Sequence, residues 1–228
     1  EMKTVSEFYP VMEGAEIKDQ TYLALNYVYD YGTNLVTTDA LNLLSYFLFN
    51  REASPIRLAL QEAGIGKDIS CSCIAYKQNV MHIIVSNSNP EEKQRFYEVV
   101  TNELQKIVDE GINKKELESV LNRLEFEQRE DNSSNRGITY LTQNVFPTFI
   151  YQGNPFVGLE YEKVIKKLKE GLKSNYYEDL IRKTMINNPH SLLISVAPKP
   201  GMDKQIVENE EQELETYKKS LTQNDIDN

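Results

Sequence analysis

The stretch SPIRLALQEAGIG, residues 54–66, reads as a short helix with a marked start and a marked end, and it leads at once into the strand-like run DISCSCIAY. Ser54 is a favoured N-cap, and Pro55 suits the first helical position, where no backbone N–H is needed. Gly64 or Gly66 supplies the left-handed residue with which many helices end. The position of this helix is therefore fixed at both ends, within an alternation of helices and strands.

Five runs of the chain have the β-branched and aromatic composition and the turn-forming boundaries that are typical of strands. They are KTVSEFYPV, QTYLALNYVYDYG, DISCSCIAY, NVMHIIVSN and SLLISVAPKPG. Lys77 and Gln78 separate the third run from the fourth, and so short a connection predicts an antiparallel hairpin.

The segments between these runs carry apolar residues at helical spacing. In TTDALNLLSYFLFN, Thr38 or Asp39 can cap the helix. Two further helices are joined by a very short linker, where Asn113 and Glu116 form a capping-box pattern. The remaining helical patterns are ITYLTQNVFPTFIY, which Pro147 kinks or ends, YEKVIKKLKEGL and YYEDLIRKTMI. The order β-β-α-α-β-β-α-α-α-α-α-β predicts an α+β fold.

Residues 202–228 differ from the rest of the chain. From residue 203 onward they hold eight acidic and three basic side chains, a net charge of −5 out of −10 for the whole chain. Val207, Leu214 and Leu221 recur every seven residues and make a narrow apolar stripe that calls for a partner helix. We therefore expect a domain over residues 1–201 and the start of an acidic helical linker over residues 202–228.

Composition narrows the class of protein. The sequence pI of about 4.9 argues against a nucleic-acid partner. No apolar run approaches the ~20 residues that span a bilayer, so no membrane partner is expected. Two cysteines and the lack of a visible signal peptide suit a reducing, cytoplasmic location. The start at Glu1, without an initiator methionine, indicates a piece excised from a longer chain.

The two histidines, His82 and His190, do not form a zinc motif. The HxxEH motif places two imidazoles one helical turn apart, whereas these two lie on separate elements. His82 alternates with apolar residues on a strand, and His190 follows Pro189 at a corner, so we interpret each as structural. Ser191 next to His190 points to the opposite face of an extended chain, which argues against a serine nucleophile.

Two other groups are weak candidates for metal ligands. Cys71 and Cys73 share one strand face but lack a CxxC knuckle and a second ligand pair, so packed free thiols are the favoured interpretation. Glu127, Glu130 and Asp131 line one side of a helix end, where a solvated face is favoured over a cation site. The sequence predicts no catalytic residue and no metal ligand in this chain.

The order of the pieces resembles a domain of the insulinase-type (pitrilysin-like) zinc metallopeptidases, in the branch of presequence protease and falcilysin. The resemblance covers residues 4–202. It rests on TYLALNYVYD, SPIRLALQEAGIGKDI, the helix pair PEEKQRFYEVVTNELQKIVDEGINKKELESVLNRLEFEQRE and NNPHSLLISVAPKPG. The acidic tail resembles the start of the helical hairpin that joins the two halves of such enzymes.

This resemblance implies a domain of the LuxS/processing-peptidase-like type, with a mostly antiparallel sheet and helices packed on one face. Family members have four similar domains around a peptide chamber, and the zinc motif belongs to the first. The order of motifs and the tail imply the second, non-catalytic domain. The implied partners are the other domains of the polypeptide and a peptide substrate, with zinc in the full-length enzyme and none here. The alternative is an inactive processing-peptidase-like subunit with a structural role.

A chamber wall needs one sheet face that is free to touch an extended peptide, at that face or by addition of a strand at an edge. Alternate residues of one predicted strand give a mixed face of this kind: Tyr22, Ala24, Asn26, Val28 and Asp30. Beside the polar break DNSSNR, Arg129, Arg136 and Tyr140 are candidate chamber contacts, with a solvated loop as the other interpretation.

Overall fold

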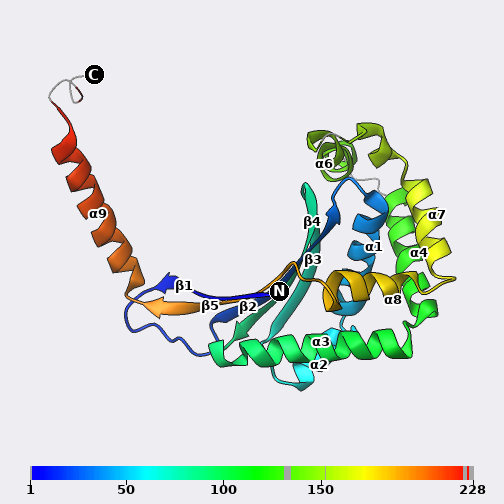
Figure 1. The fold of residues 1–228 in the computed structure, drawn as a ribbon, viewed down its shortest axis with the longest axis horizontal. Helices are drawn as coiled ribbons and strands as arrows, with labels where there is room; N and C mark the ends of the chain where they lie inside the picture. Colours follow the sequence, from blue (N-terminus) through cyan, green and yellow to red (C-terminus); the bar gives the residue numbers. More distant parts are fainter. Residues whose placement is uncertain (1, 131–134, 152, 223–224, 226–228) are drawn as a thin grey trace.

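The computed structural model describes residues 2–130, 135–151, 153–222 and 225, which form a curved sheet with helices on one side (Figure 1). The strands are β1 (Lys3–Val11), β2 (Thr21–Tyr31), β3 (Asp68–Ala75), β4 (Gln78–Ser88) and β5 (Ser191–Pro200). The helices are α1 (Leu35–Ser45), α2 (Pro55–Glu62), α3 (Lys93–Glu110), α4 (Lys114–Glu130), α5 (Arg136–Tyr140), α6 (Phe146–Ile150), α7 (Tyr161–Gly171), α8 (Tyr176–Ile181) and α9 (Met202–Ser220). The predicted α+β fold is confirmed.

The five strands form one sheet in the order β1-β5-β2-β4-β3. β3 and β4 pair as the predicted antiparallel hairpin, which Tyr76 closes by donating its N–H to the Gln78 carbonyl at 3.1 Å. β2 is antiparallel to both β4 and β5, whereas β1 lies parallel to β5 at the sheet edge. The sheet is therefore mixed but mostly antiparallel, as the resemblance implied.

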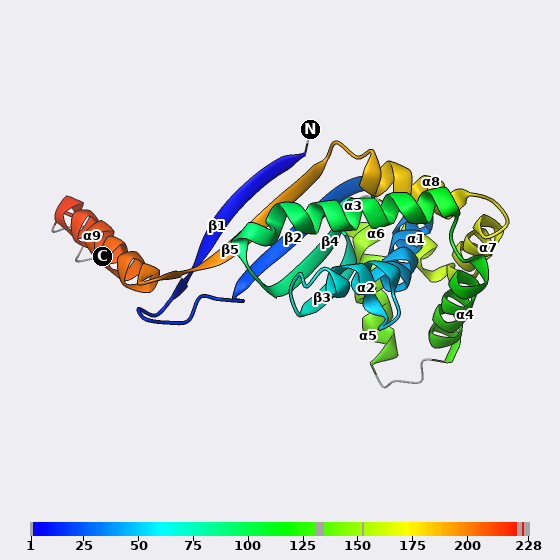
Figure 2. The ribbon, with the colours of Figure 1, turned by 90° about the horizontal axis from the view of Figure 1, so that it is seen from below.

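The core lies between the sheet and the helical layer. Leu25 of β2 stands opposite Ile83 of β4 and Leu193 of β5, and all three side chains are fully buried. α3 runs along this face and contacts β2 and β5, while α1 contacts β3 (Figure 2). Burial of each large apolar side chain contributes about 1.5–3 kcal/mol. Because side chains alternate between the two faces of a strand, one face of the sheet supplies the core, and among the described residues no helix covers the other face (Figures 1 and 2).

The first helix begins earlier than the sequence predicts. Asn34 is its N-cap and accepts the Thr37 N–H at 3.4 Å, so neither Thr38 nor Asp39 caps it. Thr38 lies inside α1, where its hydroxyl bonds the buried Asn79 amide oxygen at 2.9 Å. A turn in which the Asn34 N–H bonds the Tyr31 carbonyl brings the chain out of β2, and it places the cap four residues before Thr38 and five before Asp39.

Ser54 occupies the predicted N-cap position of α2, with Pro55 following, but its hydroxyl does not cap the helix. It accepts the Arg51 N–H and donates to the Phe47 carbonyl, both at 3.0 Å. A π-helical turn, Tyr46–Asn50, extends α1 and brings these backbone groups against Ser54. The fully buried side chain therefore holds the bend between α1 and α2.

The end of α2 follows the prediction. Gly64 has a φ of +69°, and the Gly64 and Ile65 N–H groups bond the Gln61 and Leu60 carbonyls at 3.0 Å, which is a Schellman motif. Gly66 is also left-handed, with a φ of +68°, and it lies against β4. A Cβ at Gly66 would stand 2.1 Å from Val85 Cγ1. One glycine ends the helix, and the other allows close packing on the sheet.

The helical pattern around Pro147 is interrupted in the structure. α5 runs into a π-helical turn, Leu141–Val145, and α6 restarts with Pro147 in its first turn. A short 3₁₀ turn, Pro155–Leu159, then leads into α7. Pro147 therefore begins a new helical piece, because its missing N–H is tolerated there.

Helix α9 extends away from the rest of the molecule beyond the ends of β1 and β5 (Figures 1 and 2). It has no buried residue, and Lys204 bonds Glu13 at 2.6 Å near its start. Val207 and Leu214 of the predicted stripe are 53% and 59% exposed. In the described part of the chain, this stripe packs against no other helix.

Candidate functional site

The face of the sheet opposite the helices is the first candidate site. It is built from the alternate strand residues that the core does not use, which include Tyr22, Val28, Val80, Ile84, Leu192, Ile194 and Val196. Tyr22 is 48% exposed and Ile84 is 37% exposed. Tyr9 of β1 packs edge-on against Tyr22, with ring centroids 5.9 Å apart. We name this surface the open face; it is broad and partly apolar, as expected of a surface that meets another chain.

A polar pair lies within the open face. His82 Nδ1 is 2.6 Å from Asn26 Oδ1, and Asn26 Nδ2 donates to the Leu192 carbonyl at 3.3 Å. Because Asn26 Oδ1 can only accept, the His82 Nδ1 carries the proton of this bond. Partial burial lowers the pKa of His82 below its usual value, which favours the neutral ring. The predicted structural role of His82 fits this geometry, and Nε2 is left as an acceptor toward the open face.

The β3 edge of the sheet is partly covered. Asn50 donates to the Cys71 carbonyl at 2.7 Å and accepts the Cys71 N–H at 2.9 Å. Arg57 donates to the Ile69 carbonyl at 2.8 Å. These side chains occupy backbone groups that an added strand would use. β1, at the other edge, pairs on one side with β5 and ends near Pro10, which has no N–H to donate.

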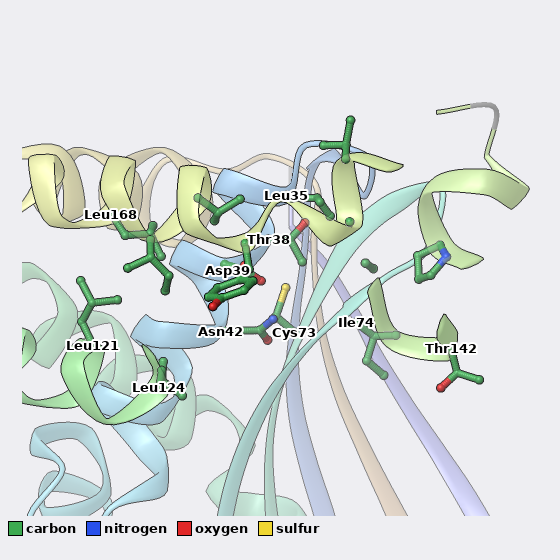
Figure 3. A pocket seen from close by; sticks show the side chains of 17 residues that line it. Leu35, Thr38, Asp39, Asn42, Cys73, Ile74, Leu121, Leu124, Thr142 and Leu168 are labelled. Atoms are coloured by element: carbon green, nitrogen blue, oxygen red, sulfur yellow. The ribbon is translucent and has the colours of Figure 1, made fainter. Parts of the chain in front are cut away.

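A cavity of about 600 Å³ is the second candidate site, and it lies within the helical part of the molecule. The walls are formed by α1, α4, α7 and the end of β3, together with Thr142, Pro147, Val157 and Gly158. In Figure 3, Asp39, Asn42 and Cys73 lie together in the lining, with Leu121, Leu124 and Leu168 on one side and Ile74 and Thr142 on the other.

Asp39 supplies the one carboxyl group among the described lining residues of this cavity, and its pKa is perturbed. Burial raises the pKa of Asp39 from 3.8 to about 6. Burial and the neighbouring Asp39 charge raise the pKa of the Cys73 thiol to about 12. Cys73 is therefore a neutral thiol near pH 7, and Cys71, more deeply buried, likewise has a raised pKa. Both cysteines are free, as predicted, and neither is a reactive thiolate.

The structure places the three predicted chamber residues at the ends of two helices. Arg129, near the end of α4, bonds Glu125 at 2.9 Å, and Lys169 of α7 bonds the same carboxylate. α4 lies in the helical part of the molecule, beyond α1 from the sheet (Figure 1). Arg136 and Tyr140 begin and end α5, and the side chain of Arg136 lies outside what the structure describes. Their contact with a peptide stays a prediction.

Three other candidates from the sequence, His190, Ser191 and Glu127, have structural partners. The His190 N–H and the Ser191 hydroxyl both bond Asn188, at 2.8 and 3.3 Å, and so fix the turn into β5. Glu127 pairs with Arg123 at 2.7 Å, while Asp131 lies outside the described residues. Among the described residues, no group of three or more His, Cys, Asp or Glu side chains is placed to hold a metal ion.

The fold defines the class of protein as an α+β domain with a five-stranded, mostly antiparallel sheet that helices cover on one face. Residues 3–124 match the family model of the peptidase M16 inactive domain, which is more than half of the chain. The chain belongs to this family.

The relatives agree with this assignment. The chain is 36% identical over 223 residues to protein HypA of Clostridium perfringens, covering 96% of this chain and 23% of that protein. It is 29% identical over 230 residues to presequence protease 1, chloroplastic/mitochondrial, of Arabidopsis thaliana, covering 96% of this chain and 21% of that protein. The chain thus spans less than a quarter of the length of these curated relatives.

A solved structure shows the same fold in a single domain. The inactive peptidase domain of a Bordetella parapertussis protein superposes with a TM-score of 0.64 at 9% identity, covering 83% of this chain and 95% of that one.

Within the described part of the chain, no helix has both the length and the apolar character needed to cross a membrane.

Proposed function

We propose that this chain is a non-catalytic domain of a zinc-dependent metalloendopeptidase that degrades peptides, and that its open face forms part of the wall of the substrate chamber. Membership of the M16 inactive-domain family supports the class. The observation that carries the proposal is the open face itself: one side of the sheet is packed with helices, and the other presents partly exposed aromatic and aliphatic side chains such as Tyr22 and Ile84.

The open face suits contact with an extended peptide. Apolar side chains from several strands form a surface on which the side chains of a peptide of any sequence can pack. The neutral His82 ring offers a hydrogen-bond acceptor for a peptide N–H group. Recognition by a broad, mixed surface gives little sequence specificity, which is useful in an enzyme that degrades many peptides. Addition of a strand at β3 is less favourable, because Asn50 and Arg57 occupy part of that edge.

The zinc of such an enzyme does not fit the residues described here. His82 and His190 lie on different elements, and His82 is bonded to Asn26. We propose that another domain of the same polypeptide supplies the zinc ligands, and that this domain and the peptide substrate are the partners of the chain. The domain boundary at residue 201, the contacts of Arg129, Arg136 and Tyr140, and a cytoplasmic location are parts of the same proposal.

The test compares this 228-residue chain with the longer protein that contains it. Elemental analysis and hydrolysis of an unstructured peptide are measured on both. We expect the chain alone to hold much less than one zinc per molecule and to leave the peptide intact, whereas the longer protein binds zinc and cleaves it. One zinc per molecule of the isolated chain contradicts the proposal. A longer protein without zinc or hydrolysis favours the inactive, structural subunit instead.

A further inference from the structure

We propose that the cavity between α1, α4, α7 and β3 binds a primary ammonium ion carried on an apolar chain, with the ammonium group paired to Asp39. This site goes beyond the proposed function, because it lies in the helical part of the molecule and not on the open face. Its volume of about 600 Å³ is within the range of small-molecule pockets.

The charge of the cavity selects a cation. Asp39 is the single carboxylate among its described lining residues, and no lysine, arginine or histidine lines it. The carboxylate of Asp39 forms no hydrogen bond or ion pair with any other residue that the structure describes. A partly buried carboxylate without a partner is costly, and a cation that enters the cavity removes this cost.

The polar groups next to Asp39 suit an ammonium ion. Asn42 lies three residues further along α1 and lines the same cavity, so its side chain shares the helix face of Asp39. An ammonium ion donates three hydrogen bonds and accepts none, which matches a carboxylate and an amide oxygen. Thr38 is already engaged with Asn34 and Asn79. Asp39 and Asn42 are thus the two side chains that bind the head group.

The rest of the lining is apolar and suits an alkyl chain. α4 contributes Leu121 and Leu124, and α7 contributes Val164, Ile165 and Leu168. A bare metal ion is disfavoured, because one carboxylate among aliphatic side chains does not supply the six or more oxygen ligands of a hard cation. An aliphatic amine uses both parts of the cavity.

The test is a titration of the 228-residue chain with n-hexylamine, followed through backbone amide chemical shifts. We expect saturable shifts at Leu35, Asp39 and Cys73 with hexylamine, and weaker binding of hexanol, which has the same chain without the charge. Asp39→Asn keeps the size of the side chain and should weaken hexylamine binding by about tenfold or more, since a charged hydrogen bond is lost. Asp68→Asn, an exposed carboxyl on β3, is the matched control and should change nothing.

The pH dependence gives a second readout. The titratable groups that face Asp39 in the cavity are Cys73 from β3 and Tyr161 from α7, while the lining residues of α4 are leucines. Burial holds the pKa of Asp39 at about 6. Between about pH 7.5 and pH 5 most Asp39 side chains become protonated, so hexylamine should bind about tenfold more weakly at the lower pH. Hexanol binding should not change.

The ammonium group has two possible sources, a free amine or the lysine side chain of a peptide. A capped glycine-lysine-glycine peptide in place of hexylamine distinguishes them: saturable shifts at the same amides identify a lysine side chain as a ligand, and their absence leaves a free amine. The proposal is overturned if hexylamine gives no saturable shift. It is also overturned if hexanol binds the parent chain as tightly as hexylamine does, or if the Asp39→Asn chain binds hexylamine as tightly as the parent chain does.

Discussion

At the scale of single residues, the two glycines after α2, Gly64 and Gly66, are required for different reasons although both have a positive φ. Gly64 has open space where a Cβ would stand, whereas at Gly66 a Cβ would meet Val85 Cγ1 at 2.1 Å and the Ser86 carbonyl oxygen at 2.7 Å. The first glycine is needed for its backbone conformation alone. The second is needed for conformation and for close approach to the sheet.

We predict that Gly64→Ala lowers the free energy of unfolding by about 1 kcal/mol, the cost of a left-handed alanine. Gly66→Ala should cost about 2–4 kcal/mol, because overpacking against β4 adds to the same backbone strain. Urea unfolding of the two variants and of the parent chain measures both values. An equal loss in the free energy of unfolding at the two positions would show that the contact with Val85 adds no cost.

Asp39 gives the stability of the fold a pH dependence. Burial raises the pKa of Asp39 from 3.8 to about 6, so the folded state binds a proton more tightly than the unfolded state. The stability from this group is fully present below about pH 3.8 and is lost as the pH rises through about 6.

We therefore predict that Asp39→Asn, which is neutral at every pH, gains stability relative to the parent chain as the pH rises from about 4 to about 7.5. The gain should be on the order of 1–2 kcal/mol, since the side chain is only partly buried and solvent screens its charge. Urea unfolding at several pH values measures this difference. A difference that does not vary with pH contradicts the raised pKa.

At the scale of helices and strands, the sequence was a good guide wherever a local rule decides the structure. Composition and turn-forming boundaries indicated five strand-like runs, and each of them corresponds to a strand of the structure. Asn113 accepts the Glu116 N–H at 3.2 Å, as its capping pattern predicted. The capping rules failed where a group outside the first turn of the helix competes for the capping side chain. Ser54 has the right place for a cap, but the Phe47 carbonyl takes its hydroxyl; Thr38 bonds Asn79, more than forty positions away.

The acidic helix α9 tests the predicted domain boundary. Because none of its residues is buried and its link to the body includes the exposed pair Lys204–Glu13, it should add little to stability. We predict that deletion of residues 202–228 changes the melting temperature by less than about 2 °C, which corresponds to less than 1 kcal/mol for a chain of this size. Thermal unfolding of both chains measures this. Loss of cooperative unfolding on deletion would place α9 within the domain.

At the scale of the whole molecule, the open face was predictable and the cavity was not. Alternation in β2 separates Leu23 and Leu25 from Tyr22 and Ala24, so the sequence indicates which residues lie on each face of the sheet. The cavity combines residues from 35 to 168 on six or more elements, and no local pattern brings these together. Asp39 in the apolar run TTDALNLL was the one available signal, because an acid between buried helix positions calls for a partner.

In the longer protein, we expect the open face to contact the peptide. The most direct measurement places the photo-crosslinking residue p-benzoylphenylalanine at Tyr22 or at Ile84 in that protein and adds a labelled peptide substrate. Leu58 of α2, which is 42% exposed in the helical layer, is the matched control. We predict that the peptide is captured from Tyr22 and Ile84 and not from Leu58. A peptide captured from none of these positions, or equally from all three, would contradict the account.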